Sequence, residues 1–210
     1  MIRQNKQKKA NTEKIYDRSR GPKYDLIAKW IGSNKRILDV GCGSGEFSRR
    51  LYTNGNHVTG IEPSEENYKI AAGKIKVYYG DFSRIEIKDG FDIVLFGDVL
   101  EHMLDPERAI GKAKELAREM ILCVPNFDFW GVKVLKFFGI NKMKSGILDE
   151  NHVYSFNRRK IEEMIVDNGF KILDFASPAP RRFPGFYNHI IQLNPAFFGY
   201  QFIYRCKVVE

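Results

Sequence analysis

Three glycines lie within five residues in the segment 40–47 (VGCGSGEF), directly after the apolar run ILDV. Gly41, Gly43 and Gly45 give up side chains that could pack in a core, and glycine readily adopts unusual turn angles. Where such a turn opens a helix, backbone N–H groups point toward whatever is bound there. The segment therefore predicts a ligand lying against the backbone, although a glycine-rich turn alone is weak support because loops also use glycine for steric reasons.

Four carboxylates mark the ends of four successive apolar segments. Asp39 comes two residues before Gly41, and Glu62, Asp81 and Asp98 follow the next three segments in turn. In an open parallel sheet, ligands bind at the carboxyl ends of the strands, so these acids are expected at the ligand edge. Each acid alone is typical of a helix cap or a solvated turn. Together they would repel one another unless a cationic or hydroxyl-rich ligand lay between them.

This row of acids favours S-adenosylmethionine over a dinucleotide. A pyrophosphate would enter an acidic rim, and the pattern G-x-G-x-x-G would need glycine where Glu46 stands. S-adenosylmethionine carries a sulfonium, an ammonium and two ribose hydroxyls, and it has no phosphate. Glu62 is suited to accept both ribose hydroxyls. Asp81 is suited to accept from the adenine amino group, with the ring of Phe82 against the adenine face.

The four histidines of the chain are candidates for proton transfer. An oxygen atom that accepts a methyl group usually loses a proton, and histidine is the side chain suited to take it at neutral pH. His102 follows the fourth apolar segment beside the expected methyl position, and His152 lies close to the acidic residues Asp149 and Glu150. We predict His102 first and His152 second as general bases, with a structural role as the alternative for each. His57 is interpreted as structural, and His189 has no interpretable role.

The elements that must position these residues alternate along the chain. Strands are predicted at 36–40, 57–62, 75–79, 91–96, 120–124, 171–175 and 201–209. Helices are predicted at 45–52, 64–72, from 105 onward and at 157–168. The strands are continuously apolar, which is typical of a parallel sheet covered by helices on both faces. The sequence therefore predicts an α/β fold.

Two segments fall outside this alternation. Residues 1–35 are expected to form a basic arm and a leading helix before a main domain at 36–210. Residues 126–154 contain the aromatic run FDFWGVKVLKFFGI and are predicted to be a partly helical insertion over the site. A lid over the substrate pocket is the first interpretation. Peripheral membrane contact through 127–140 is second, because lysines and aromatic residues mix there, and a dimer contact is third.

Length and composition limit the class of protein. A chain of 210 residues fits one domain with a small addition, and no apolar run approaches the ~20 residues of a membrane span. The first residues hold no apolar segment, so no secretory signal is expected. Three widely spaced cysteines form neither a metal-binding pattern nor a disulfide framework. We therefore expect a cytoplasmic protein and predict no metal site.

The net charge of +8 is unevenly distributed. Residues 1–36 hold 11 Lys/Arg against 3 Asp/Glu, whereas residues 37–125 hold 11 against 15. The basic arm could meet nucleic acid or an anionic membrane, but a solvated terminus is the favoured interpretation. A nucleic-acid partner is therefore not expected, a small-molecule substrate is, and the oligomeric state is left open.

Five segments together resemble the class I S-adenosylmethionine-dependent methyltransferases. They are ILDVGCGSGEF (37–47), VTGIEPSEE (58–66), YYGDF (78–82), FDIVLFGDVLEHMLDP (91–106) and ILCVPN (121–126). Their order and spacing match the successive motifs of that family over about the middle half of the chain. Residues 146–175 are similar, more loosely, to a subgroup acting on quinone precursors, sugars or lipid-linked intermediates. The D/N-P-P-Y signature for planar amino nitrogens is missing, which disfavours N-methylation of bases or glutamine.

The resemblance implies a Rossmann-like three-layer sandwich, with a mostly parallel seven-stranded sheet and an antiparallel last strand. It also implies methyl transfer from S-adenosylmethionine to a small-molecule acceptor, for which we predict an oxygen atom. An RNA or protein methyltransferase using the basic arm, a nucleotide-dependent oxidoreductase and a non-catalytic cofactor-binding protein are the alternatives. The cofactor-binding residues that it implies are Asp39, Gly41, Cys42, Gly43, Gly45, Glu62, Pro63, Asp81, Phe82 and Asp98.

Overall fold

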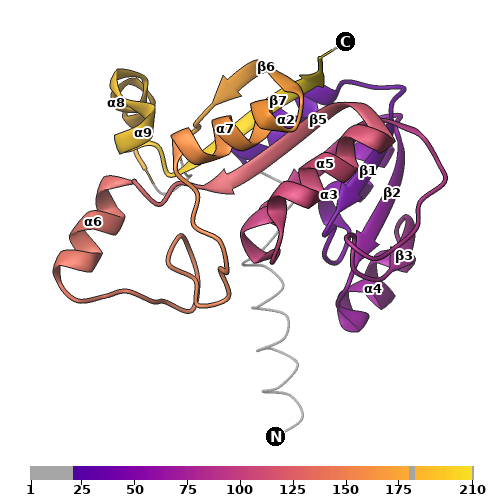
Figure 1. Cartoon of the computed structure of the whole chain (residues 1–210), viewed down its shortest axis with the longest axis horizontal. Coiled ribbons are helices and arrows are strands. Elements are labelled where there is room, and N and C mark those ends of the chain that lie inside the picture. Colours follow the sequence, from indigo (N-terminus) through magenta and orange to yellow (C-terminus); the bar gives the residue numbers. More distant parts are fainter. Residues whose placement is uncertain (1–20, 180–182, 210) are drawn as a thin grey trace, which may run out of the picture.

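Seven strands form one sheet at the centre of the computed structural model, which describes residues 21–179 and 183–209 (Figure 1). The strand order is β3-β2-β1-β4-β5-β7-β6. The first five strands pair in parallel, and β7 pairs antiparallel with both β5 and β6. The predicted α/β fold is confirmed by these strands: β1 (Arg36–Val40), β2 (His57–Glu62), β3 (Lys76–Tyr79), β4 (Phe91–Gly97), β5 (Ala117–Pro125), β6 (Phe170–Ala176) and β7 (Gln201–Val208).

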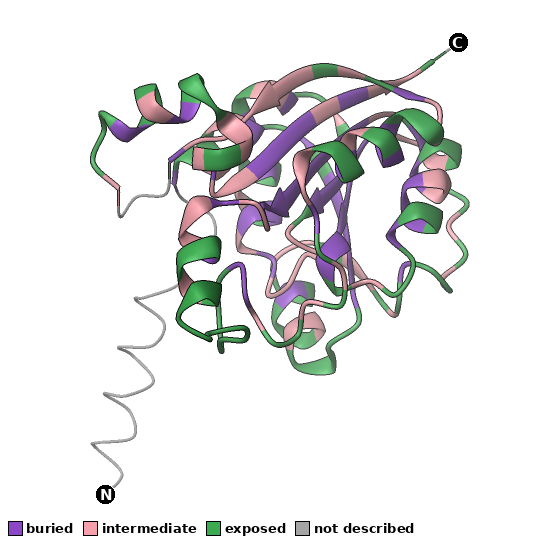
Figure 2. Ribbon diagram, turned by 60° about the vertical axis from the view of Figure 1, so that its left-hand side comes forward, coloured by how far each residue is buried: buried purple, intermediate pink, exposed green. Residues whose placement is uncertain are grey.

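Helices cover both faces of the sheet, so the molecule has three layers (Figure 2). Alternate residues of the central strands point to opposite faces. Ile37 and Leu95 belong to a core cluster shared with α2 and α3, whereas Leu38 and Phe96 belong to one shared with α5 and α7. The described helices are α2 (Pro22–Ile31), α3 (Glu46–Thr53), α4 (Glu65–Ala72), η1 (Leu100–His102), α5 (Pro106–Leu116), α6 (Trp130–Phe137), α7 (Arg158–Asp167), α8 (Tyr187–Leu193) and α9 (Pro195–Phe198).

Side-chain caps begin three of the predicted helices. Ser64, Asp105 and Asn157 precede α4, α5 and α7, and each accepts a hydrogen bond from the backbone N–H three residues later. Such a cap satisfies one of the N–H groups that a helix start leaves without a partner. The predicted starts of these helices are therefore confirmed.

The fifth strand is longer than predicted. It begins at Ala117, directly after α5, whereas the apolar pattern begins at Met120. Of the extra strand residues, Ala117 pairs with β4 and Glu119 pairs with β7, where the guanidinium of Arg205 lies 3.0 Å from the carboxylate of Glu119. Charged residues that pair between strands are not part of an apolar run. A prediction from apolar residues alone therefore begins this strand three residues too late.

The predicted insertion at 126–154 folds as helix α6 followed by a long loop. Phe129 and Val132 pack against Ile147 and Leu148 of that loop, in a cluster separate from the main core. The indole N–H of Trp130 donates to the hydroxyl of Tyr187 at 2.7 Å and joins α6 to α8. Figure 1 shows α6, α8 and α9 gathered beyond the end of β5.

The basic arm predicted at the start of the chain lies outside the described residues over positions 1–20. The leading helix predicted after the arm is α2. None of the helices in the described ranges has the length and apolar character needed to cross a membrane.

Candidate functional site

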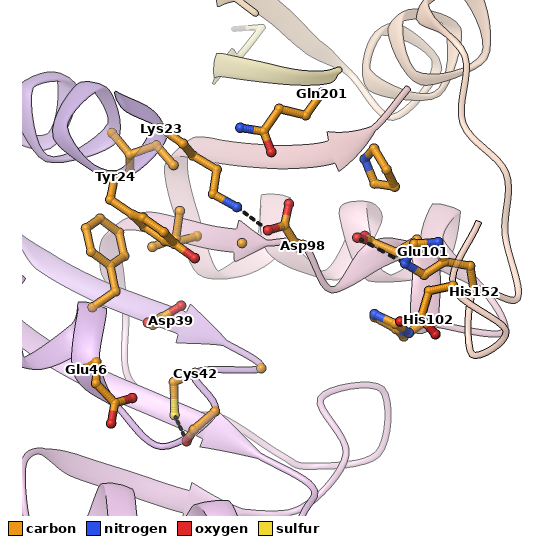
Figure 3. A pocket seen from close by; sticks show the side chains of 18 of the residues that line it. Lys23, Tyr24, Asp39, Cys42, Glu46, Asp98, Glu101, His102, His152 and Gln201 are labelled. Atoms are coloured by element: carbon orange, nitrogen blue, oxygen red, sulfur yellow. Dashed lines mark hydrogen bonds and ion pairs between the residues drawn. The ribbon is translucent and has the colours of Figure 1, made fainter. Parts of the chain in front are cut away.

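A pocket of about 540 Å³ opens at the carboxyl ends of β1 and β4 (Figure 3). The chain leaves β1 toward β2 on one side and β4 toward β5 on the other, so this is where the strand order reverses and where ligands bind in such sheets. The volume falls in the usual range for small-molecule sites. Helix α2, the glycine loop, the end of β4, η1, the loop at 146–152 and the start of β7 all contribute to its walls.

The glycine loop has the backbone geometry that the sequence predicts. Gly41 and Gly43 have φ angles of 69° and 58°, which residues other than glycine rarely adopt. A Cβ on Gly41 would come within 2.5 Å of the Val99 side chain, so packing also excludes one there. A Cβ on Gly43 would meet no protein atom within 4 Å. Gly43 therefore leaves open space at the pocket, where a ligand can approach the backbone.

Glu62 holds this loop in place. Its side chain is 5% exposed, and its two carboxylate oxygens accept from the backbone N–H groups of Gly43 at 2.8 Å and Ser64 at 2.9 Å. It lies behind the loop and is not among the residues that line the pocket. Each carboxylate oxygen can accept more than one hydrogen bond, so these contacts leave acceptor capacity for a ligand.

Asp39 is a buried carboxylate on the pocket wall. It is 5% exposed and accepts a hydrogen bond from the hydroxyl of Ser48. Burial raises the pKa of Asp39 to about 7, and the charge of Glu62 adds to this rise. A cationic ligand beside Asp39 would favour its ionised form.

Lys23 and Asp98 form an ion pair inside the pocket, which sequence reasoning missed (Figure 3). The Lys23 side chain, on α2, is 13% exposed, and the Cys123 thiol donates to the second oxygen of Asp98 at 3.1 Å. Burial is the largest single effect on Lys23 and by itself would lower its pKa. The charge and hydrogen bond of Asp98, together with the acidic groups of Cys123 and Tyr24, raise the pKa overall. No local pattern marks this lysine among the many in the first 36 residues. The pair adds a positive charge to a wall that was predicted to be acidic.

We expect Lys23→Met to lower the free energy of unfolding by about 1–2 kcal/mol, because Asp98 would lose its ammonium partner. A fully buried pair would cost more, but the Asp98 side chain is 37% exposed and water screens it. Urea unfolding measures the change. Lys29→Met, at an exposed position on the same helix, is the matched control. Equal stability of the two variants would contradict a stabilising role for the pair.

The two predicted histidines lie together, although 50 positions separate them in sequence. The ring centroids of His102, at the end of η1, and His152, in the loop, are 4.9 Å apart. The backbone carbonyl of Glu101 accepts from the N–H groups of Val153 at 2.8 Å and Tyr154 at 3.0 Å, which holds the loop against η1. Both histidines and Glu101 line the pocket. Glu101 is a site residue that sequence reasoning passed over, and its signal was its position beside His102.

Two of the predicted cofactor residues do not face the pocket. Phe82 is 2% exposed and packs edge-on against Phe96, with the ring centroids 5.6 Å apart. Its ring packs in the core and is not exposed at the pocket, in contrast to the position against adenine that the sequence predicts. The Asp81 carboxylate is exposed and accepts from the backbone N–H and the hydroxyl of Ser83, at 2.8 and 2.6 Å.

Of the other positions singled out in the sequence, some line the pocket and others do not. Cys42 lines the pocket, whereas Pro63 and Gly45 are not among its lining residues. His57, which the sequence analysis interprets as structural, begins β2 at the opposite end of the sheet from the pocket. Helix α6 does not contribute to the pocket wall, but the loop that follows it does. The aromatic run and the pocket-lining part of the insertion are therefore different segments.

Comparisons with known proteins agree with this architecture. A family model described as a methyltransferase domain matches residues 13–174. A ubiquinone biosynthesis O-methyltransferase of Aromatoleum aromaticum is 36% identical over 107 residues, which are 44% of this chain and 46% of that protein. A protein of the same name from Rhizobium leguminosarum is 41% identical over 80 residues, 34% of this chain and 32% of the relative. The chain thus spans about half or less of the length of these curated relatives.

A solved structure has a similar fold. The magnesium protoporphyrin IX methyltransferase of Synechocystis, with S-adenosylhomocysteine bound, superposes with a TM-score of 0.68. The match covers 88% of this chain and 81% of that protein, at 22% identity. At this identity the likeness establishes the fold alone.

Proposed function

Because the chain belongs to the class I S-adenosylmethionine-dependent methyltransferases, we propose that it transfers the donor's methyl group to an oxygen atom of a small organic acceptor. The observation that carries the proposal is the pocket at the end of β1 and β4. One wall holds the glycine loop and Asp39, and the opposite wall holds Glu101 and the two histidines. In this proposal the donor site and the proton-transfer site share one pocket.

The donor is proposed to lie along the glycine loop. Gly41, Cys42 and Gly43 would run beside its methionine part, and Gly45 would begin the helix behind them. The pair formed by Lys23 and Asp98 matches the donor's carboxylate and ammonium in charge. The other residues proposed to bind the donor are Asp39 near the ammonium, Glu62 and Pro63 near the ribose, and Asp81 with the backbone of Phe82 near the adenine.

The acceptor is proposed to lie beside the two histidines. Methyl transfer is an in-line displacement at carbon, in which the protein chiefly aligns the partners and excludes water. Burial lowers the pKa of His152, so this ring is neutral near pH 7 and able to accept a proton from a hydroxyl. The loop at 146–152 lines the same part of the pocket, which supports a role for the insertion in selecting the acceptor.

The curated relatives support oxygen as the acceptor atom. Both are named as O-methyltransferases of ubiquinone biosynthesis, which favours an aromatic hydroxyl of the quinone-precursor type. The match covers under half of this chain, so the acceptor class rests on this partial likeness together with the histidine pair. An RNA or protein substrate, or cofactor binding without turnover, is the alternative.

A methyl-transfer assay with the full chain tests the proposal. The protein is incubated with S-adenosylmethionine labelled in its methyl group and with matched pairs of phenols and anilines. We expect label in the phenols and S-adenosylhomocysteine as the second product. Label appearing only in anilines, RNA or protein would overturn the oxygen acceptor. Donor binding without transfer to any acceptor would overturn the enzymatic role.

We also propose that α6 and the residues after it contact an anionic membrane surface. Phe137 and Phe138 are 85% and 73% exposed, and residues 129–146 hold four lysines and no acidic residue. Exposed aromatic side chains among lysines are typical of segments that lie in the headgroup region. Such a contact would bring a lipid-soluble acceptor close to the pocket.

A vesicle flotation assay tests the membrane contact. We expect the full chain to float with vesicles that contain phosphatidylglycerol and not with pure phosphatidylcholine. Replacing Phe137 and Phe138 together by serine should abolish flotation. Leu104→Ser removes one exposed apolar side chain elsewhere and is expected to have no effect. Flotation that survives the double replacement would contradict this surface as the site of contact.

A further inference from the structure

Three side chains that suit metal binding converge on one wall of the pocket. Glu101, His102 and His152 each offer one ligand atom, and these atoms all lie within 4.8 Å of one another. Nε2 of His152 is 4.0 Å from a carboxylate oxygen of Glu101. Figure 3 shows the three side chains together at the end of the pocket away from the glycine loop. Two segments distant in sequence thus build one compact set of ligands.

The Glu101 carboxylate is buried, but one of its two oxygens has no hydrogen-bond partner among the described residues. The side chain is 2% exposed, and its Oε2 atom has no hydrogen-bond partner among the described residues. Burial, and then the charge of Asp98, raise the pKa of Glu101 well above its ordinary value. A buried carboxylate oxygen is costly unless it meets a proton, a donor or a cation. The other oxygen of this carboxylate, Oε1, lies 4.0 Å from Nε2 of His152, and the carboxylate lies beside two imidazole rings, which are groups that can bind metals.

Both histidines are held in the tautomer that binds metals. Nδ1 of His102 is 3.1 Å from the carbonyl oxygen of Asn151, and Nδ1 of His152 is 2.9 Å from that of Ile147. A carbonyl oxygen only accepts, so the hydrogen-bond network assigns the proton to Nδ1 in each ring. The Nε2 atoms then carry free lone pairs. A backbone carbonyl on the far nitrogen is the usual support of a metal-bound histidine.

We propose that Glu101, His102 and His152 bind one divalent metal ion, which in turn binds the hydroxyl oxygen of the acceptor. The inference rests on the methyl-transfer function proposed above and deepens it, and it departs from the sequence analysis, which predicts no metal site. Two imidazoles and one carboxylate suit Zn²⁺ and its transition-metal neighbours, whereas Mg²⁺ prefers oxygen ligands alone. Three protein ligands leave a position open for the acceptor.

The ion would activate the acceptor by lowering the pKa of its bound hydroxyl. The hydroxyl proton leaves to water, and the oxygen then attacks the methyl carbon of the donor. A carbon–oxygen bond forms while the carbon–sulfur bond breaks, and its electron pair stays on sulfur to give S-adenosylhomocysteine. No atom changes oxidation state through the metal, so a redox-inert ion such as Zn²⁺ suffices. The two histidines serve here as ligands, so the ion takes over the activation of the hydroxyl that the sequence and the proposed function assign to the imidazole rings.

Calorimetric titration of the metal-free full chain with Zn²⁺ tests the site. We expect one ion per chain, and binding weakened by about 100-fold or more in Glu101→Gln and in His152→Asn. His57→Asn makes the same change at an exposed histidine at the opposite end of the sheet and should bind as the parent does. Bound Co²⁺ should show a visible absorption band in the parent that both site variants lose. Equal Zn²⁺ binding in all four proteins, or none in the parent, would overturn the proposal.

Two further measurements separate this inference from the proposed function. S-adenosylhomocysteine should bind the metal-free parent and Glu101→Gln, because the donor site does not need the ion. Zn²⁺ should raise the melting temperature of the parent and not that of the folded Glu101→Gln variant. Methyl transfer that continues at the parental rate with a chelator present would overturn the metal site alone. Failure of the parent to bind either donor or product would overturn the proposed function itself.

Discussion

Glu62→Gln is expected to weaken S-adenosylhomocysteine binding by about 100-fold. The carboxylate of Glu62 accepts from the backbone N–H groups of Gly43 and Ser64 at once, one on each oxygen. A glutamine offers one oxygen, so its amino group would face one of these donors and leave it unsatisfied. A buried polar group left without its hydrogen bond costs about 1–3 kcal/mol, which corresponds to about 10–100-fold in affinity. Loss of an acceptor for the ribose hydroxyls adds to this.

Calorimetry with the parent and two variants checks the expectation. Glu66→Gln makes the same chemical change at an exposed position four residues further along the chain and should bind as the parent does. Thermal unfolding shows whether each variant is folded at the temperature of the titration. Undiminished binding in a folded Glu62→Gln protein would contradict both the loop-holding role of Glu62 and its place in the donor site.

Asp39→Asn is expected to stabilise the protein, by about 4 kcal/mol, at pH 8 and to leave its stability nearly unchanged near pH 4. The pKa of Asp39 is raised from 3.8 to about 7 by burial, so the folded protein holds this proton more tightly than the unfolded chain. The stability that protonated Asp39 contributes is fully present below about pH 4 and is lost as the pH rises through about 7. Each pKa unit corresponds to about 1.4 kcal/mol. Asparagine has no charge to bury, and its amide oxygen can still accept from Ser48.

Urea unfolding of the two proteins between about pH 4 and pH 8 measures this difference. Asp167→Asn, at the exposed end of α7, should follow the parent at every pH. The replacement that raises the stability at pH 8 should lower the affinity for the donor. The donor's ammonium favours an ionised carboxylate, so Asp39→Asn should bind S-adenosylmethionine about 10-fold more weakly at pH 8. Parallel stability curves for the parent and Asp39→Asn would show that Asp39 does not titrate near pH 7.

Much of the fold could be predicted because its signals are local. The strand at 36–40 is a short apolar run that ends in glycines, and its bounds match the prediction. Ser64 and Asp105 mark helix starts through hydrogen bonds that span three residues. The glycine loop could be predicted for the same reason, since Gly41 and Gly43 need backbone angles that few other residues adopt.

The features that could not be predicted depend on contacts between distant segments. Lys23 meets Asp98 across 75 positions, and Glu101 meets His152 across about 50, so no window of sequence contains either pair. The ring of Phe82 was assigned to the ligand because it follows an acid at a strand end. The ring is buried because it packs against Phe96 of β4, and this contact cannot be deduced from the order of residues along the chain.

The position of β7 has a consequence for how the protein is made. This strand lies between β5 and β6 and pairs antiparallel with both, yet it follows both in the chain. During translation, β6 therefore leaves the ribosome with no neighbouring strand to join. One edge of β5 stays open for the same interval. A nascent chain stalled before residue 201 would expose unpaired strand edges on both β5 and β6, which are ready templates for aggregation and for recognition by chaperones.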